Sequence, residues 1–83
     1  MINIQHKKQA MGEWKKKPFL EQMANIGSEV YRAMDWKEKD KEIAEMAFIR
    51  SLELFDLTKD SKLTYSQFRE LTRMREMWVD YFK

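Results

Sequence analysis

The sequence predicts an all-α fold, an antiparallel bundle of three helices over about residues 18–37, 41–57 and 64–82. Two glycines and one proline among 83 residues leave few positions at which a helix must end. In each of the three stretches, apolar residues recur at intervals of three and four, the period of a buried helical stripe. A chain of this length forms at most one domain. We expect residues 18–83 to be that domain, and residues 1–17 to be a basic N-terminal arm or short extra helix.

The N-terminal arm holds five lysines and one glutamate, a net charge of +4, whereas the whole chain carries +2. Pro18 disfavours a helical conformation at the preceding residue, so the arm is expected to end at Lys17. Lysines near Trp14 suit contact with phosphates and stacking on a base. His6, the single histidine, is interpreted as a solvated side chain. The candidate nucleic-acid contacts combine the arm with the last helix and are Lys15, Lys16, Lys17, Arg73 and Arg75.

The first helix is expected to begin at Pro18, because a proline in the first turn lacks only an N–H that would have no helical partner. Gly27 lies beside the apolar stripe of this helix and indicates a close crossing with a neighbouring helix. The predicted stripe is Phe19, Leu20, Met23, Ile26, Val30, Ala33 and Met34.

The second and third helices each have a predicted start signal. Asp40 is the expected N-cap of the second helix. Thr64 and Gln67 are expected to form a capping box, in which each side chain bonds the backbone N–H of the other residue. The predicted stripe of the third helix is Phe68, Leu71, Met74, Trp78 and Phe82. That of the second helix is wider and includes Ile43, Met46, Ala47, Phe48, Ile49, Leu52, Leu54, Phe55 and Leu57.

Apolar residues beside the three primary stripes suggest a surface for protein–protein association. The candidate partner-binding residues are Phe48, Leu54, Leu57, Met77 and Tyr81. Such a surface favours a homodimer or a complex with another protein, and methionine suits adaptable contacts. The sequence has no cysteine and no phosphate-binding glycine loop. We therefore expect a non-enzymatic protein without catalytic residues, metal, cofactor or small-molecule substrate. The absence of a membrane-spanning stretch and of a signal-peptide pattern favours a cytoplasmic location.

The stretch FDLTKDSKLTYSQF resembles a calcium-binding EF-hand loop between Asp56 and Gln67. In that register Asp56, Thr58 and Asp60 occupy the first three ligand positions. Gln67 stands where a bidentate glutamate is needed, and Ser61 stands in place of the glycine. We interpret the loop as a degenerate EF-hand in which Asp56 and Asp60 are turn residues, with calcium binding as a second alternative function.

The C-terminal stretch RMREMWVDYF resembles the end of HEPN-type helical bundles, in which an arginine and a polar residue precede a histidine. Arg75 and Glu76 match the first two positions, and Asp80 stands in place of the histidine. The resemblance implies an often dimeric helical bundle that cleaves RNA or belongs to a toxin–antitoxin pair. Asp80 lacks the imidazole that would move a proton. An HEPN-like RNA-binding or toxin–antitoxin-associated protein is therefore the first alternative function. The run IGSEVYRAMDWKEKD is similar to small uncharacterised helical proteins of bacteria and archaea, which implies no activity.

Overall fold

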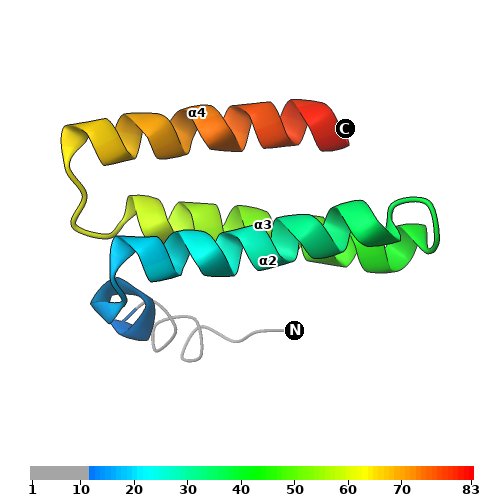
Figure 1. Cartoon of the computed structure of the whole chain (residues 1–83), viewed down its shortest axis with the longest axis horizontal. Coiled ribbons are helices and arrows are strands. Elements are labelled where there is room, and N and C mark those ends of the chain that lie inside the picture. The colour runs from blue at the N-terminus through cyan, green and yellow to red at the C-terminus, as the bar shows by residue number, and fades with distance from the viewer. Residues whose placement is uncertain (1–11) are drawn as a thin grey trace.

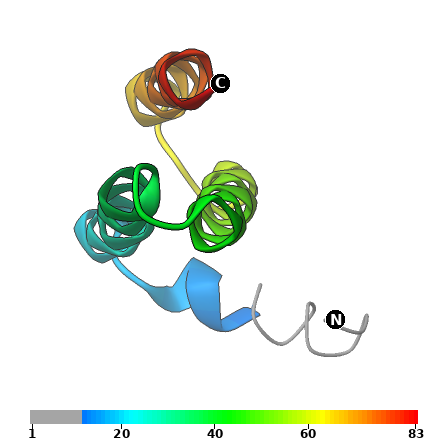
Figure 2. The ribbon, with the colours of Figure 1, turned by 90° about the vertical axis from the view of Figure 1, so that its right-hand side faces the viewer.

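The computed structural model describes residues 12–83, which are helical apart from the connections and contain no strand. Its helices are α2 (Phe19–Trp36), α3 (Lys41–Lys59) and α4 (Tyr65–Phe82), and residues 12–16 are also helical. Figure 1 shows the three long helices with their axes roughly aligned. Figure 2 shows α2 and α3 side by side, with α4 on one side of the pair and residues 12–16 on the other. The predicted all-α class is confirmed. Residues 1–11 and the calls that fall on them, including His6, lie outside the described residues.

The start of α2 differs from the prediction by one residue. Pro18 precedes the helix with an extended backbone (φ −59°, ψ 150°), and its carbonyl accepts the N–H of Gln22 at 3.0 Å. Gly27 is not at a close crossing, since a Cβ atom added there would meet nothing within 4 Å. The face of α2 that packs inward instead holds Gln22, Ile26 and Ala33.

The N-cap of α3 is confirmed, because Asp40 Oδ1 accepts the backbone N–H groups of Glu42 at 3.0 Å and Ile43 at 3.3 Å. The helix continues two residues beyond its predicted end, to Lys59. Asp56 is therefore a helical residue and not a turn residue. Small side chains lie on the buried face of α3, among them Ala44, Ala47 and Ser51. Small side chains permit close packing of helices, and the contact between α2 and α3 is the most extensive helix–helix contact in the described chain.

The capping box of α4 is also confirmed. Thr64 Oγ1 accepts the N–H of Gln67 at 3.1 Å, and Gln67 Oε1 accepts the N–H of Thr64 at 3.0 Å. From this start α4 runs along α3 with a smaller contact than that between α2 and α3. It buries Leu71, Trp78 and Phe82. The Phe82 ring stacks on Phe48 with 4.3 Å between ring centroids, so Phe48 lies in the core.

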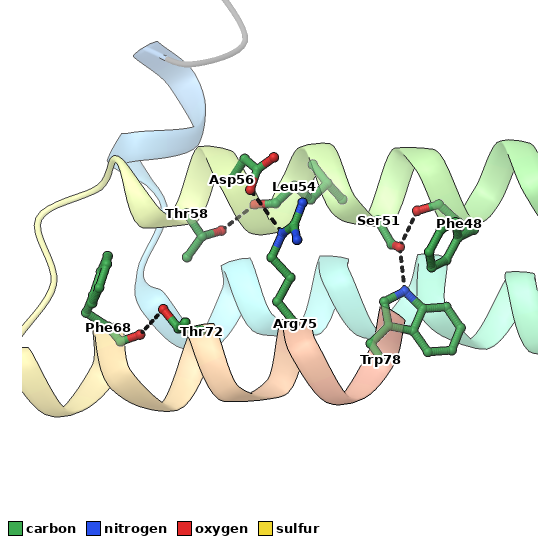
Figure 3. Close-up of polar contacts among 9 residues, drawn as sticks. All are labelled: Phe48, Ser51, Leu54, Asp56, Thr58, Phe68, Thr72, Arg75 and Trp78. Carbon is green, nitrogen blue, oxygen red and sulfur yellow. Dashed lines mark hydrogen bonds and ion pairs between the residues drawn. The ribbon is translucent and has the colours of Figure 1, made fainter. Parts of the chain in front are cut away.

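Two tryptophans attach the outer segments to α3. Trp14 Nε1 donates to Thr58 Oγ1 at 2.8 Å, and Trp78 Nε1 donates to Ser51 Oγ at the same distance. The two acceptors are seven residues apart, which places them two turns apart on one face of α3. Figure 3 shows the Trp78 bond reaching from α4 to α3. Trp14 is only 7% exposed, so its indole offers little surface on which a base could stack.

Candidate interaction surface

The five predicted partner-binding residues do not form one exposed face. Phe48 is 3% exposed and belongs to the core, and Leu54 and Leu57 are half-buried against that core. Met77 and Tyr81, on α4, are 64% and 62% exposed. The placement of Phe48 inside the core follows from its ring stacking on Phe82, a contact between residues 34 positions apart. Of the predicted set, only the two α4 residues are largely available to a partner.

Helix α4 exposes more large apolar side chains than either neighbour. The exposed residues on α4 are Tyr65 (78%), Phe68 (44%), Met74 (37%), Met77 (64%) and Tyr81 (62%). They flank a narrow buried stripe at Leu71, Trp78 and Phe82, because α4 contacts the rest of the bundle along one side only. Phe68 and Met74 were expected to be buried with that stripe. A helix that is apolar well beyond its buried stripe offers a surface for a partner.

Tyr81 is held in place although most of its ring is exposed. Its ring lies over Trp78 with 6.2 Å between centroids, and Lys37 Nζ lies 5.2 Å from its centroid. Lys37 follows the end of α2, so this contact joins the C-terminal ends of α2 and α4. An aromatic side chain that is already ordered loses little conformational entropy when a partner covers it.

Two ion pairs join α4 and the residue that follows it to α3. Arg75 Nε lies 3.1 Å from Asp56 Oδ1, and Lys83 Nζ lies 2.8 Å from Glu45 Oε1. Figure 3 shows Arg75 reaching across to Asp56. Exposed pairs of this kind contribute at most about 1 kcal/mol each. The side of α4 that faces α3 is the one that buries Leu71, Trp78 and Phe82, and the ion pairs add to that packing. The first pair also engages Arg75 within the chain.

The predicted nucleic-acid contacts are not brought together. Lys15 and Lys16 are exposed on the segment that lies on the opposite side of the α2–α3 pair from α4, as Figure 2 shows. Lys17 pairs with Glu21 at 3.2 Å. Arg73 is exposed on α4, whereas the neighbouring Arg75 is half-buried and paired with Asp56. These residues therefore do not make one continuous basic surface.

The residues behind the two motif resemblances also have definite positions. Arg75 and Asp80 are five residues apart on α4, which turns their side chains about 140° from each other around the helix axis. In the EF-hand register, residues 56–59 belong to α3, so the twelve positions do not form one loop. Within residues 12–83, no three or more acidic, histidine or cysteine side chains are grouped so as to hold a metal ion.

The outer sides of α2 and α3 carry further exposed apolar residues, all but one of which sequence periodicity had assigned to buried stripes. They are Leu20 (79%), Tyr31 (71%), Met34 (46%), Ile43 (37%), Met46 (71%) and Ile49 (49%), of which Tyr31 was not in a predicted stripe. The width of the apolar arcs was a usable signal, because an arc wider than one contact face must leave an edge in solvent. Which edge is exposed depends on where the neighbouring helix lies.

No protein family model, curated protein or solved structure matches this chain. The similarities to EF-hand loops and HEPN bundles therefore stay predictions from short motifs. Among residues 12–83, no helix is long and apolar enough to cross a membrane.

Proposed function

We propose that this chain is a non-enzymatic helical protein that acts by protein–protein association, and that it self-associates through the exposed side of α4. The observation that carries the proposal is the exposure of five large apolar side chains on this one helix, with Met77 and Tyr81 each more than 60% exposed. Complete burial of a side chain of this size contributes about 1.5–3 kcal/mol. These side chains are already partly covered, so a second copy gains only part of that value from each and must cover several of them to offset the entropy lost on association.

The finer architecture belongs to the same proposal. Residues 18–83 act as one antiparallel three-helix domain, since the connections at residues 37–40 and 60–64 are of the length that joins antiparallel neighbours. The smaller contact of α4 with the bundle is the feature that leaves its apolar residues for a partner. A cytoplasmic location and the RNA-binding alternative stay predictions. The RNA alternative is less well supported because Lys15 and Lys16 lie on the opposite side of the α2–α3 pair from α4, which carries Arg73.

Sedimentation equilibrium of the full chain tests the proposed self-association. The mass is expected to rise from 10.2 kDa towards twice that value, 20.4 kDa, as the protein concentration increases through the micromolar range. Met77→Glu places a charge among the exposed apolar residues and is expected to weaken the dimer. Met46→Glu, on α3, is the matched control, because Met46 is 71% exposed and lies on another helix. A wild-type chain that stays monomeric at several hundred micromolar contradicts the proposal.

A further inference from the structure

Four charged side chains form a stripe along the outer side of α4. We name it the α4 charge stripe, and its members are Arg69, Arg73, Glu76 and Asp80. Their spacings of four, three and four residues place them within about 60° around the helix axis. All four are exposed, and none of them takes part in an ion pair within residues 12–83. The two basic residues lie in the first half of the stripe and the two acidic residues in the second half.

This order of charges is unfavourable for α4 by itself. Arg69 and Arg73 are like charges at i and i+4, and so are Glu76 and Asp80, which destabilises a helix. The order also opposes the helix dipole, which favours acidic residues near the N-terminus and basic residues near the C-terminus. The first turn of α4 has no acidic residue, and its last turn has no basic residue. Arg73 and Glu76 are the only opposite charges of the stripe at a favourable spacing, i and i+3, so the stripe gains little from contacts within its own helix.

The same order is self-complementary when two α4 helices run antiparallel. We infer that the α4 charge stripe is the contact between two copies of this chain, an inference that rests on the proposed self-association. The Arg69/Asp80 and Arg73/Glu76 pairs have the same midpoint along α4. One two-fold axis, midway between residues 74 and 75, therefore places Arg69 against Asp80 of the second copy and Arg73 against its Glu76.

An isologous dimer interface requires this kind of self-complementarity, because the same patch is used by both copies. The two-fold axis generates each ion pair twice, giving four pairs across the interface. A parallel pairing of the two helices would instead place arginine against arginine and acid against acid. Charge complementarity thus selects a second copy of α4 as the occupant and the antiparallel direction as its orientation.

Apolar side chains border the charge stripe on both edges. Met77 follows Arg73 by four residues and lies at one edge, while Tyr65 lies at the other. Tyr65, Phe68 and Thr72, with Arg69, Arg73 and Glu76, line a shallow groove along the first part of α4. The two-fold axis is perpendicular to both α4 helices, so the Met77 residues of the two copies lie on the same side of the interface. The two Met77 residues are then about 7–8 Å apart along the axis and able to touch.

Charge reversal tests the pairing. Arg73→Glu alone and Glu76→Arg alone are each expected to raise the dimer dissociation constant at least about tenfold, since each converts two attractive contacts into repulsive ones. The double variant Arg73→Glu/Glu76→Arg is expected to restore it to within about threefold of wild type. Lys62→Glu, in the exposed connection before α4, is the control for the change in net charge. Circular dichroism verifies that each variant remains helical.

The outcomes separate the two proposals. A wild-type chain that never dimerises overturns the proposed function. A wild-type dimer that is unaffected by Arg73→Glu and Glu76→Arg overturns the charge-stripe inference and leaves self-association standing. Single variants that weaken the dimer without recovery in the double variant also overturn the inference.

Cysteine cross-linking tests the register directly, because the chain has no cysteine of its own. A mixture of Arg69→Cys and Asp80→Cys chains is expected to form a disulfide-linked dimer on oxidation. Arg69→Cys alone is not, because two copies of residue 69 lie about 16 Å apart along the axis, whereas a disulfide needs Cα atoms within about 7 Å. Efficient cross-linking of Arg69→Cys with itself, or none in the mixture, contradicts the antiparallel register.

Discussion

The bond between Trp78 and Ser51 offers the sharpest test of how α4 is attached to α3. Ser51 is completely buried, accepts the Trp78 indole N–H at 2.8 Å and donates its own hydrogen to the carbonyl of Phe48, as Figure 3 shows. Ser51→Ala removes the acceptor and leaves the indole N–H without a partner. Trp78 is only 7% exposed, so water has little access to that group.

A buried donor without a partner costs about 1–3 kcal/mol, which is the expected loss in the free energy of unfolding for Ser51→Ala. The total stability of a chain of this length is about 4–12 kcal/mol, so the loss is a large fraction of it. Each kcal/mol corresponds to a fall in Tm of about 4–8 °C for a domain of this size. Trp78→Phe removes the donor and also some packed volume, and its cost is expected to be larger.

Urea unfolding followed by circular dichroism measures these losses, at one protein concentration because self-association would otherwise shift the curves. A double-mutant cycle of Ser51→Ala and Trp78→Phe is expected to show a coupling free energy of about 0.5–1.5 kcal/mol. Ser28→Ala is the control, since Ser28 likewise donates to a carbonyl of the preceding turn, that of Ala24, but is exposed. Effects of the two variants that add within about 0.3 kcal/mol would refute the argument that this bond attaches α4.

Two further changes in stability follow from local helix structure. Gly27→Ala is expected to stabilise the protein by about 0.5–1 kcal/mol, because the added Cβ meets no atom within 4 Å and glycine is unfavourable inside a helix. Urea unfolding measures the change, and a loss of stability would contradict the open space around Gly27. Thr64→Ala removes the capping-box acceptor of Gln67 N–H and is expected to cost about 0.5–2 kcal/mol. Ser66→Ala, an exposed change in the same turn that removes no cap, serves as its control, and equal effects of the two variants would count against the cap.

The features that follow from neighbours in the sequence were predictable. Asp40 and Thr64 begin their helices because their side chains accept N–H groups two or three residues ahead, and no distant part of the chain takes part. The spacing of Leu71, Trp78 and Phe82 likewise placed them on one face of α4, and that face is buried. The end of α3 was placed two residues too early, because Asp56 and Asp60 suggested a turn although nothing in that stretch prevents another half-turn of helix.

Tertiary contacts decided which apolar residues are covered. Sequence periodicity predicts that Leu20 and Ile26 are both buried, yet Leu20 is 79% exposed and Ile26 only 2%. Phe48 illustrates the reverse, since its place in the core depends on Phe82, which lies on another helix. A wide apolar arc in the sequence indicates only that some of its residues are buried. The position of the neighbouring helix selects them.

The sequence by itself determined the helices, their caps and the order of charges along α4, since each depends on residues within about one or two turns. Only the tertiary structure placed Trp14 and Trp78 against hydroxyls of α3, and engaged Arg75 with Asp56 while Arg73 remained exposed. It also showed that the α4 charge stripe faces solvent. The physical reason is that helix caps and the order of charges depend on residues close together in the sequence, whereas burial depends on how distant segments pack together.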